Sequence, residues 1–238
     1  MEDNKLNYDK IRKLYEKSQG IWPKQNNWYD YTRKKISQFI KKCSLGGYIL
    51  NAGSGGNSYG LHNKMCHVDI VKKNICRYED YVVANIEDMP FEDSTFDSVI
   101  CVGDVINYCD AEKAIKELCR VVKKWGKLII EFENSNSYEY ILKGFYGCDK
   151  TIVNLEYMKE VTNQYLYSQQ YLSGMLRKNG FDVKEELSIH IISSLVSNWI
   201  SDDNISSLFA AFDIIFNKFS CFKTHGSNIL YLCEKIEM

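Results

Sequence analysis

Apolar residues near the start of the chain recur at the spacing of one face of an α-helix. Two such stretches lie between Tyr8 and Cys43, and a break from Gly20 to Asn27 that contains Pro23 separates them. The pattern predicts two helices ahead of the main body of the protein. Their apolar positions are Ile11, Leu14 and Tyr15 in the first stretch, and Tyr29, Ile36, Phe39 and Ile40 in the second.

After Gly46 and Gly47 the pattern changes to short apolar runs separated by helical or turn segments. Runs that alternate with helices in this way predict a mostly parallel sheet with helices packed on it. The clearest helix runs from Ala111 to Lys124, with Asp110 placed to cap its start. The five predicted strands are Tyr48 to Ala52, Met65 to Ile70, Tyr81 to Ala84, Ser98 to Val102 and Lys127 to Phe132.

The last hundred residues begin with a segment, Tyr138 to Tyr167, in which periodicity is lost and aromatic residues accumulate. A helix is predicted from Ser168 to Asn179, ended by Gly180, and alternating apolar residues then predict a strand through Ile189. The remaining predictions are a helix capped by Asp202 or Asp203, with an apolar stripe from Ile205 to Phe219, and a strand from Asn228 to Glu234.

These elements predict an α/β protein: a Rossmann-like sheet of seven strands, mostly parallel, with helices on both faces and an antiparallel last strand. We expect residues 1–238 to form a single domain. Within it, 1–46 are expected to form an N-terminal helical cap, 47–133 a cofactor-binding core, and 134–238 a substrate-side insertion, which acts as a lid, together with the C-terminal strands.

Composition narrows the possible partners. The chain has 30 Lys and Arg against 31 Asp and Glu, so it lacks the basic excess that binds nucleic acid. Its 9 cysteines include no Cys-x-x-Cys pair and no Cys/His spacing of a zinc site. We therefore expect no metal and a reducing compartment, the cytoplasm. No apolar run is long enough to span a bilayer, so membrane insertion is not expected. The sequence does not indicate an oligomeric state.

The sharpest local signal is an apolar strand that runs directly into glycines, Asn51-Ala52-Gly53-Ser54-Gly55-Gly56-Asn57. So tight a turn needs residues without a Cβ atom, and it can present backbone N–H groups to a ligand. The third glycine of a dinucleotide fingerprint is missing, because Ser58 stands at its position. Alone, this turn is equally consistent with an ordinary connection between a strand and a helix.

Asp69 strengthens this signal, because it ends the next predicted strand. A carboxylate at that place accepts hydrogen bonds from both hydroxyls of a ribose in nucleoside-binding α/β folds. The alternative is an exposed cap at the strand end. The third signal is the segment Ala84-Asn85-Ile86-Glu87-Asp88-Met89-Pro90-Phe91, which follows the third strand.

With these motifs the chain resembles class I S-adenosylmethionine-dependent methyltransferases, especially the small-molecule group of the methyltransferase-11 type. The resemblance covers Tyr48 to Phe132 most closely. It implies S-adenosyl-L-methionine as cofactor, S-adenosyl-L-homocysteine as product, and a small-molecule acceptor with an oxygen, nitrogen or sulfur nucleophile, such as a sugar, a glycolipid or a secondary metabolite. The cofactor-binding residues that it implies are Asn51, Gly53, Ser54, Gly55, Asn57, Asp69, Ile70, Asn85, Ile86 and Gly103.

This sequence departs from the family's pattern at three places. The family usually has Asp where Asn51 and Asn85 stand, and Pro-Gly where Lys124-Trp125 stand. An amide oxygen still accepts a hydrogen bond, but the lost negative charge at Asn51 weakens attraction to a cationic cofactor.

Methyl transfer needs mainly positioning and, for a weakly acidic nucleophile, removal of a proton. The catalytic candidates are Tyr108, which follows the fourth strand, and His190, which ends a later one. Both side chains are also typical of ordinary packing. Glu133, just past the fifth strand, is either a base or a solvated loop acid.

Two functions of other kinds remain open on the residues alone. One is an NAD- or nucleotide-binding oxidoreductase on the related dinucleotide fold, which accounts for Gly53 and Asp69 but not for the missing glycine. The other is a non-catalytic protein that keeps a cofactor-shaped scaffold.

Overall fold

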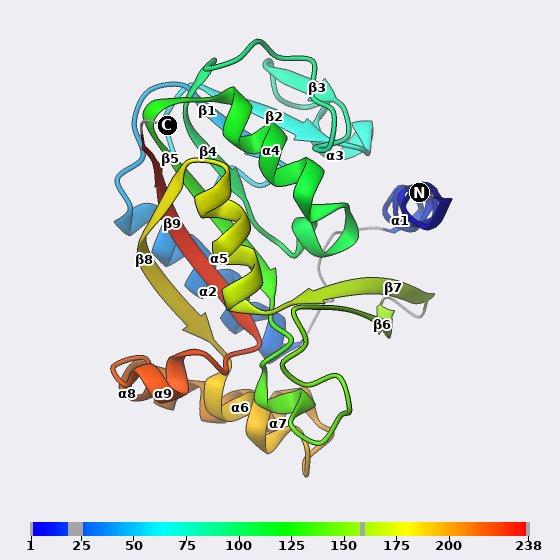
Figure 1. Cartoon of the computed structure of the whole chain (residues 1–238). Helices are drawn as coiled ribbons and strands as arrows, with labels where there is room; N and C mark the ends of the chain where they lie inside the picture. The colour runs from blue at the N-terminus through cyan, green and yellow to red at the C-terminus, as the bar shows by residue number, and fades with distance from the viewer. Residues whose placement is uncertain (1, 19–25, 158–159, 237–238) are drawn as a thin grey trace.

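A seven-stranded sheet runs through the centre of the computed structural model, which describes residues 2–18, 26–157 and 160–236 (Figure 1). Its strand order is β3-β2-β1-β4-β5-β9-β8. The first five strands are parallel, and β9 runs antiparallel to both β5 and β8, which confirms the predicted fold class. The strands are β1 (Ile49–Ala52), β2 (Met65–Asp69), β3 (Tyr81–Val83), β4 (Phe96–Cys101), β5 (Val122–Glu133), β8 (Phe181–Ile189) and β9 (Asn228–Lys235).

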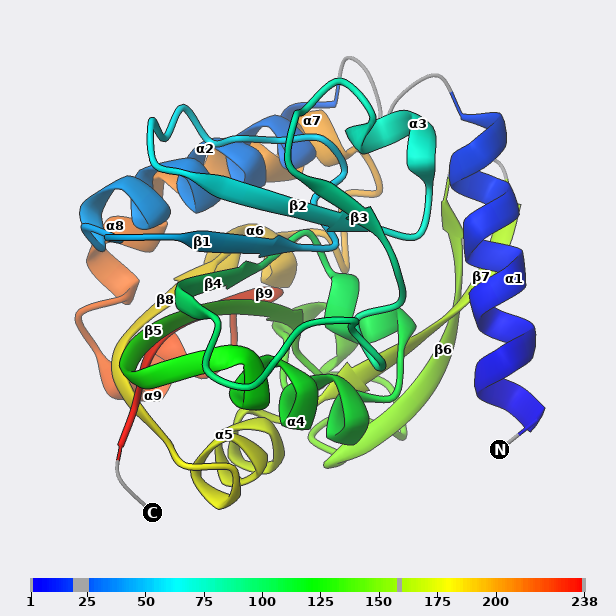
Figure 2. The same ribbon diagram turned by 90° about the horizontal axis from the view of Figure 1, so that it is seen from above.

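Helices cover both faces of this sheet, as Figure 2 shows. One face packs on α2 (Asn27–Lys42), and the other packs on α4 (Ala111–Val121) and α5 (Gln169–Lys178). Successive strand residues point to opposite faces, so the central strands are apolar throughout. Leu50, Val99 and Leu128 pack toward α4 and α5, while their neighbours Ile49, Ile100 and Ile129 pack toward α2.

Capping side chains set the starts of these helices. Asp110 accepts hydrogen bonds from the N–H groups of Glu112 and Lys113 at the start of α4, as predicted. The predicted end of α4 at Lys124 is wrong, because the chain turns into β5 at Val122, where it pairs with Phe96 of β4. Pairing with β4 therefore ends the helix about one turn earlier than predicted.

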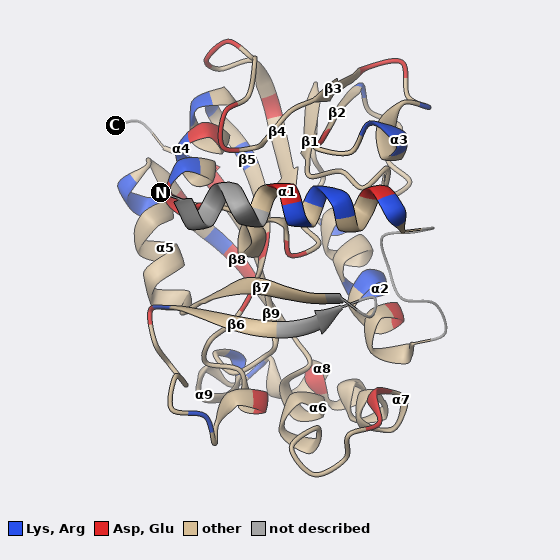
Figure 3. Ribbon diagram, turned by 90° about the vertical axis from the view of Figure 1, so that its right-hand side faces the viewer, with Lys and Arg blue, Asp and Glu red and all other residues tan. Residues whose placement is uncertain are grey.

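The N-terminal helix α1 (Glu2–Lys17) confirms the first predicted helix, and Pro23 lies outside the described residues. It packs against β7 (Glu160–Tyr167), which pairs antiparallel with β6 (Lys150–Tyr157) (Figure 3). This hairpin and the short 3-10 helix η2 (Tyr138–Tyr140) make up the aromatic-rich segment, which the sequence left without elements. None of the helices in the described ranges is long and apolar enough to cross a membrane.

The single long helix predicted beyond Asp202 is wrong. Asp202 caps α7 (Asp203–Ser206) as expected, but the chain then continues as short turns, and much of the apolar stripe faces solvent, with Leu208 68 % exposed. Polar side chains are the cause. The Asp213 carboxylate accepts N–H groups from His190 and Ile191, and Asn217 bonds the backbone of Ser188, so the polar side of this segment faces inward. The other elements here are α6 (Ile191–Val196), η3 (Ser207–Phe212), α8 (Asp213–Phe216) and α9 (Ser220–Lys223).

A buried carboxylate on β5 joins three parts of the sheet. Glu131 is fully buried, and one of its oxygens accepts the N–H groups of Gly103 and Asp104, which follow β4. Its other oxygen accepts the side-chain amide of Asn228, at the start of β9, at 2.7 Å. The same amide donates to the Asp104 carboxyl at 3.1 Å. Glu131 therefore fixes the loop after β4 relative to β5 and β9.

We expect Glu131→Ala to lower the free energy of unfolding by about 3 kcal/mol, because it leaves buried donors without an acceptor. Glu131→Gln keeps one acceptor oxygen, so its loss should be about half as large. Chemical denaturation of both variants measures the difference. A loss below about 1 kcal/mol for Glu131→Ala would show that water replaces the carboxylate at little cost.

Candidate functional site

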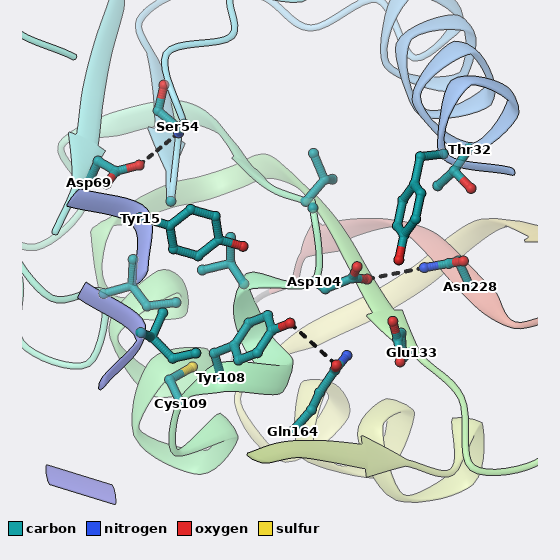
Figure 4. Close-up of a pocket in the computed structure, with 18 of the residues that line it drawn as sticks. Tyr15, Thr32, Ser54, Asp69, Asp104, Tyr108, Cys109, Glu133, Gln164 and Asn228 are labelled. Atoms are coloured by element: carbon teal, nitrogen blue, oxygen red, sulfur yellow. Dashed lines mark hydrogen bonds between the residues drawn. The ribbon is translucent and has the colours of Figure 1, made fainter. Parts of the chain in front are cut away.

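A cavity of about 390 Å³ opens at the carboxyl ends of β1, β2, β4 and β5, where ligands bind in open α/β sheets (Figure 4). Side chains from α1 and α2 form part of its wall, namely Tyr8, Ile11 and Tyr15 of α1 and Trp28, Tyr29 and Thr32 of α2. The lead-in helices and the sheet therefore enclose one space.

The glycine turn after β1 forms one end of this cavity. Gly53 has a φ of +69°, and a Cβ atom there would overlap the side chain of Val105. Gly55 also has a positive φ, of +52°. Asn51 is buried beneath the turn, where its amide donates to the Asn57 carbonyl at 2.6 Å. It therefore holds the turn in shape instead of lining the cavity.

Asp69 lies beside the glycine turn and is only 8 % exposed. Its two oxygens each accept one backbone N–H, from Gly55 at 2.7 Å and from Val71 at 2.8 Å. Burial raises the pKa of this carboxyl, and these hydrogen bonds oppose the rise. The Asn74 side chain also hydrogen-bonds this carboxyl, so of its roughly four acceptor positions about one remains for a ligand.

The other predicted cofactor residues meet at the same end. Ser54, Asn57, Ile70, Asn85, Ile86 and Gly103 all line the cavity. Asn85 accepts the Glu87 N–H at 3.0 Å through its side-chain oxygen, which shapes the loop after β3. Gly103 has a φ of +88°, a backbone conformation that favours glycine. The structure thus brings the predicted cofactor residues together with the exception of Asn51, and their roles stay predictions.

The two catalytic candidates lie in different places. Tyr108 lines the cavity, and its hydroxyl donates to the side-chain oxygen of Gln164 at 3.3 Å. His190 is fully buried behind the wall, where its ring stacks on Trp28 with centroids 3.7 Å apart and contacts the Thr32 hydroxyl at 2.8 Å. Burial lowers its pKa to about 3. A catalytic role for either residue stays a prediction, and as placed His190 supports Trp28.

Four carboxyl groups surround the end of the cavity away from Asp69. Glu133, Asp104, Asp203 and Glu139 all line the cavity, as does Tyr29. Desolvation raises the pKa of Tyr29 most, and the charges of these four acids raise it further. From the sequence, Glu133 was considered as a base, and Asp104 as a residue that could face the cofactor or the acceptor. The others come from segments far apart in the chain, and an acid after a strand or in a helix cap carries no sequence signal of a shared site.

The pKa of Glu133 lies far above the ordinary value of a carboxyl group. Burial, with a smaller contribution from the nearby Glu139 carboxyl, raises its pKa to about 8. The amide of Gln164 lies beside it and partly offsets this rise. Burial also raises the pKa of Asp104 and Glu139. At neutral pH the folded protein therefore keeps a proton on Glu133 that an unfolded chain would release.

The side-chain amide nitrogen of Gln164, at this end of the cavity, has no hydrogen-bond partner. Gln164 is 2 % exposed, and among the residues that the structure describes its Nε2 is the one buried side-chain polar atom without a hydrogen-bond partner. It lies near Glu133 but does not meet it in hydrogen-bonding geometry. An unpaired buried donor is unfavourable, so this wall suits a ligand or water that supplies an acceptor.

Comparisons with known proteins agree with the geometry of the glycine end. Residues 44–130 match the model of a methyltransferase domain. An uncharacterized protein of Methanocaldococcus jannaschii is 26 % identical over 215 residues, which cover 81 % of this chain and 82 % of that protein. The ubiquinone/menaquinone biosynthesis C-methyltransferase of Francisella tularensis subsp. novicida is 32 % identical over 100 residues, or 42 % of this chain and 39 % of that enzyme.

A solved structure shares the fold over most of the chain. It is a candidate S-adenosylmethionine-dependent methyltransferase from Listeria monocytogenes, with a TM-score of 0.64 and 12 % identity. The match covers 87 % of this chain and all of that one. At this level of identity the similarity establishes the fold.

The raised pKa of Glu133 makes stability depend on pH with a definite sign. Between the ordinary pKa of 4.5 and about 8 the folded protein keeps a proton that the unfolded chain loses, so stability falls as pH rises through this window. Glu133→Gln stays neutral at every pH and removes this contribution. We expect its melting temperature to fall less than that of the wild type between about pH 5 and about pH 8.5.

Asp104 and Glu139 contribute to the same slope, so only the difference between wild type and variant reports on Glu133. Glu185→Gln is the matched control, because Glu185 pairs with Lys42 at the surface, with its side chain 41 % exposed. Parallel curves for wild type and Glu133→Gln would contradict the prediction.

Proposed function

Because the chain belongs to the class I S-adenosylmethionine-dependent methyltransferase family, we propose that it transfers a methyl group to a small-molecule acceptor bound in the same cavity as the cofactor. The observation that carries this proposal is the continuity of the cavity. One space includes the glycine turn and Asp69 at one end, and Glu133 and Gln164 at the other (Figure 4).

The residues at the glycine end fit S-adenosylmethionine. Positive φ angles at Gly53 and Gly55 let the backbone come close to a ligand, and a side chain at Gly53 would disturb the turn. The remaining acceptor position of Asp69 suits a hydroxyl of a ribose. Asn85 and Ile86 line the cavity, and the resemblance to the family assigns them to the adenine. When bound, this cofactor supplies a methyl group activated by a positively charged sulfur.

The chain's own contribution is to position the reactants and to exclude water. Tyr15 reaches the cavity from α1, and Trp28 reaches it from α2, so these helices cover the space that a cofactor would fill. Glu131 fixes Gly103 and Asp104 between the two ends of the cavity. Holding the acceptor in line with the methyl group accounts for most of the acceleration that such a reaction requires.

The arrangement of the cavity suggests a different role for each of three parts of the chain. We propose that residues 1–46 act as a cap over the cofactor, 47–133 bind it, and 134–238 provide most of the acceptor end through Gln164 and Glu139. All nine cysteines are free thiols, which supports a reducing compartment such as the cytoplasm as the site of action.

Asp69→Asn tests the proposed cofactor site. We expect it to weaken S-adenosylhomocysteine binding about 10- to 100-fold, the effect of losing a hydrogen bond to a charged group. Asn keeps one acceptor oxygen for the Gly55 or Val71 N–H, so the fold should survive. Calorimetry measures the dissociation constants.

Asp182→Asn is the control, because Asp182 pairs with Lys184 at the surface of β8. A wild-type protein that does not bind S-adenosylhomocysteine would refute the proposal, and binding of NAD in its place would favour an oxidoreductase. Binding of S-adenosylhomocysteine without turnover on any amine, alcohol, thiol or acid offered would favour a non-catalytic role.

A further inference from the structure

We propose that the methyl acceptor is a small amine that enters as an ammonium ion and is held and deprotonated by Glu133. This inference rests on the proposed methyl transfer and names the chemical class of its second substrate. The ammonium group would lie at the end of the cavity away from Asp69, close to Tyr29 and Gln164.

The charge of the cavity wall favours a cationic ligand. Of the described residues that line it, six are acids, whereas Lys143 is the one basic residue among them. A carboxylate or phosphate group in this space would be repelled, and a cation would be attracted. The six acids are Asp69, Glu87, Asp104, Glu133, Glu139 and Asp203.

Three of these acids concentrate at the proposed acceptor end. Burial raises the pKa of Tyr140 first, and the carboxyls of Glu139, Glu133 and Asp104 raise it further, as they also do for Tyr29. No Lys or Arg in the described part of the chain forms an ion pair with any of the three. Burial raises the pKa of all three, so without a cation the protonated forms are favoured, and a bound ammonium ion would stabilise the ionised carboxylates instead.

The three acids are not equivalent, and their partners single out Glu133. The Asp104 carboxyl accepts the Asn228 amide, and Glu139 is hydrogen-bonded to the hydroxyls of Tyr140 and Ser227. Glu133 has only the imperfectly aligned Gln164 amide beside it. Figure 4 places Glu133 and Gln164 away from Asp69, with Tyr108 and Asp104 between. Asp104 is therefore closer to the cofactor end, and Glu133 is left for the acceptor.

The unpaired amide of Gln164 is an independent sign that a ligand belongs here. Its Nε2 is buried without an acceptor, although its oxygen is already held by the Tyr108 hydroxyl. Native protein structures rarely leave a buried hydrogen-bond donor without an acceptor. An oxygen or nitrogen acceptor on the ligand, separate from its ammonium group, would satisfy this donor.

The proposed step balances without any further reactant. When the ammonium ion binds, its positive charge favours the ionised form of Glu133, whose proton leaves to solvent. The Glu133 carboxylate then accepts one proton from the ammonium ion, which frees the nitrogen lone pair. The C–N bond forms as the bond between methyl carbon and sulfur breaks, and the electron pair of that bond stays on sulfur. The nitrogen becomes a methylated ammonium, and the proton on Glu133 passes to solvent after product release. A carboxyl group whose pKa is near the working pH suits this exchange.

A set of probes with one carbon skeleton and different charge tests the proposal on the full chain. We would measure binding of 2-phenylethylamine, 2-phenylethanol and phenylacetate by calorimetry with saturating S-adenosylhomocysteine. The amine should bind at least about tenfold more tightly than the alcohol, and phenylacetate should bind most weakly. Mass spectrometry with S-adenosylmethionine should then detect a methylated amine and no methyl ether.

Glu133→Gln should reduce the preference for the amine to less than about twofold while the dissociation constant of S-adenosylhomocysteine changes by less than about twofold. Glu185→Gln at the surface should leave both unchanged. If the wild type binds S-adenosylhomocysteine but binds the alcohol or phenylacetate as tightly as the amine, the amine proposal is wrong and methyl transfer stands. If S-adenosylhomocysteine does not bind, both proposals fail.

Discussion

The hydrogen bonds of the Glu131 carboxylate hold the site together. This single buried group accepts from the backbone after β4 and from Asn228 at the start of β9. The carboxyl ends of parallel strands have no ladder beyond them to fix the loops that follow. The Glu131 carboxylate on β5 supplies the missing hydrogen bonds to the loop after β4. It thereby fixes Gly103 and Asp104 between the two ends of the cavity.

The layers and the glycine end were predictable because their determinants are local in the sequence. Each β-strand of the core is a short apolar run that ends in a turn residue, as at Gly53 or Asp69, and caps such as Asp110 mark where helices start. The cofactor residues follow consecutive strands, so a correct order of strands brings them together. The lead-in helices were found for the same reason, since one apolar face is enough to identify each.

The contacts at the end of the cavity away from Asp69 were not predictable because they join distant segments. Glu133, Glu139 and Gln164 come from the end of β5, a short 3-10 helix and a hairpin strand. No spacing in the sequence relates them. The broken C-terminal helix failed for a related reason: Asp213 and Asn217 bind β8 and the start of α6, and these tertiary bonds outweigh the apolar stripe.

The two ends of the cavity each contain a buried carboxyl group, but the surroundings of the two groups differ. Asp69 is surrounded by backbone donors, from Gly55 and Val71, that exist in the protein before any ligand arrives. Glu133 meets other acids and a misaligned amide, and its pKa is raised to about 8. At Asp69 three hydrogen bonds oppose the rise in pKa that burial causes, whereas at Glu133 only the Gln164 amide does so. With the functions proposed above, the first arrangement suits a cofactor that donates hydroxyl groups, and the second suits a substrate that loses a proton. One acid lies on β2 and the other at the end of β5, so the two proposed roles are separated within a single cavity.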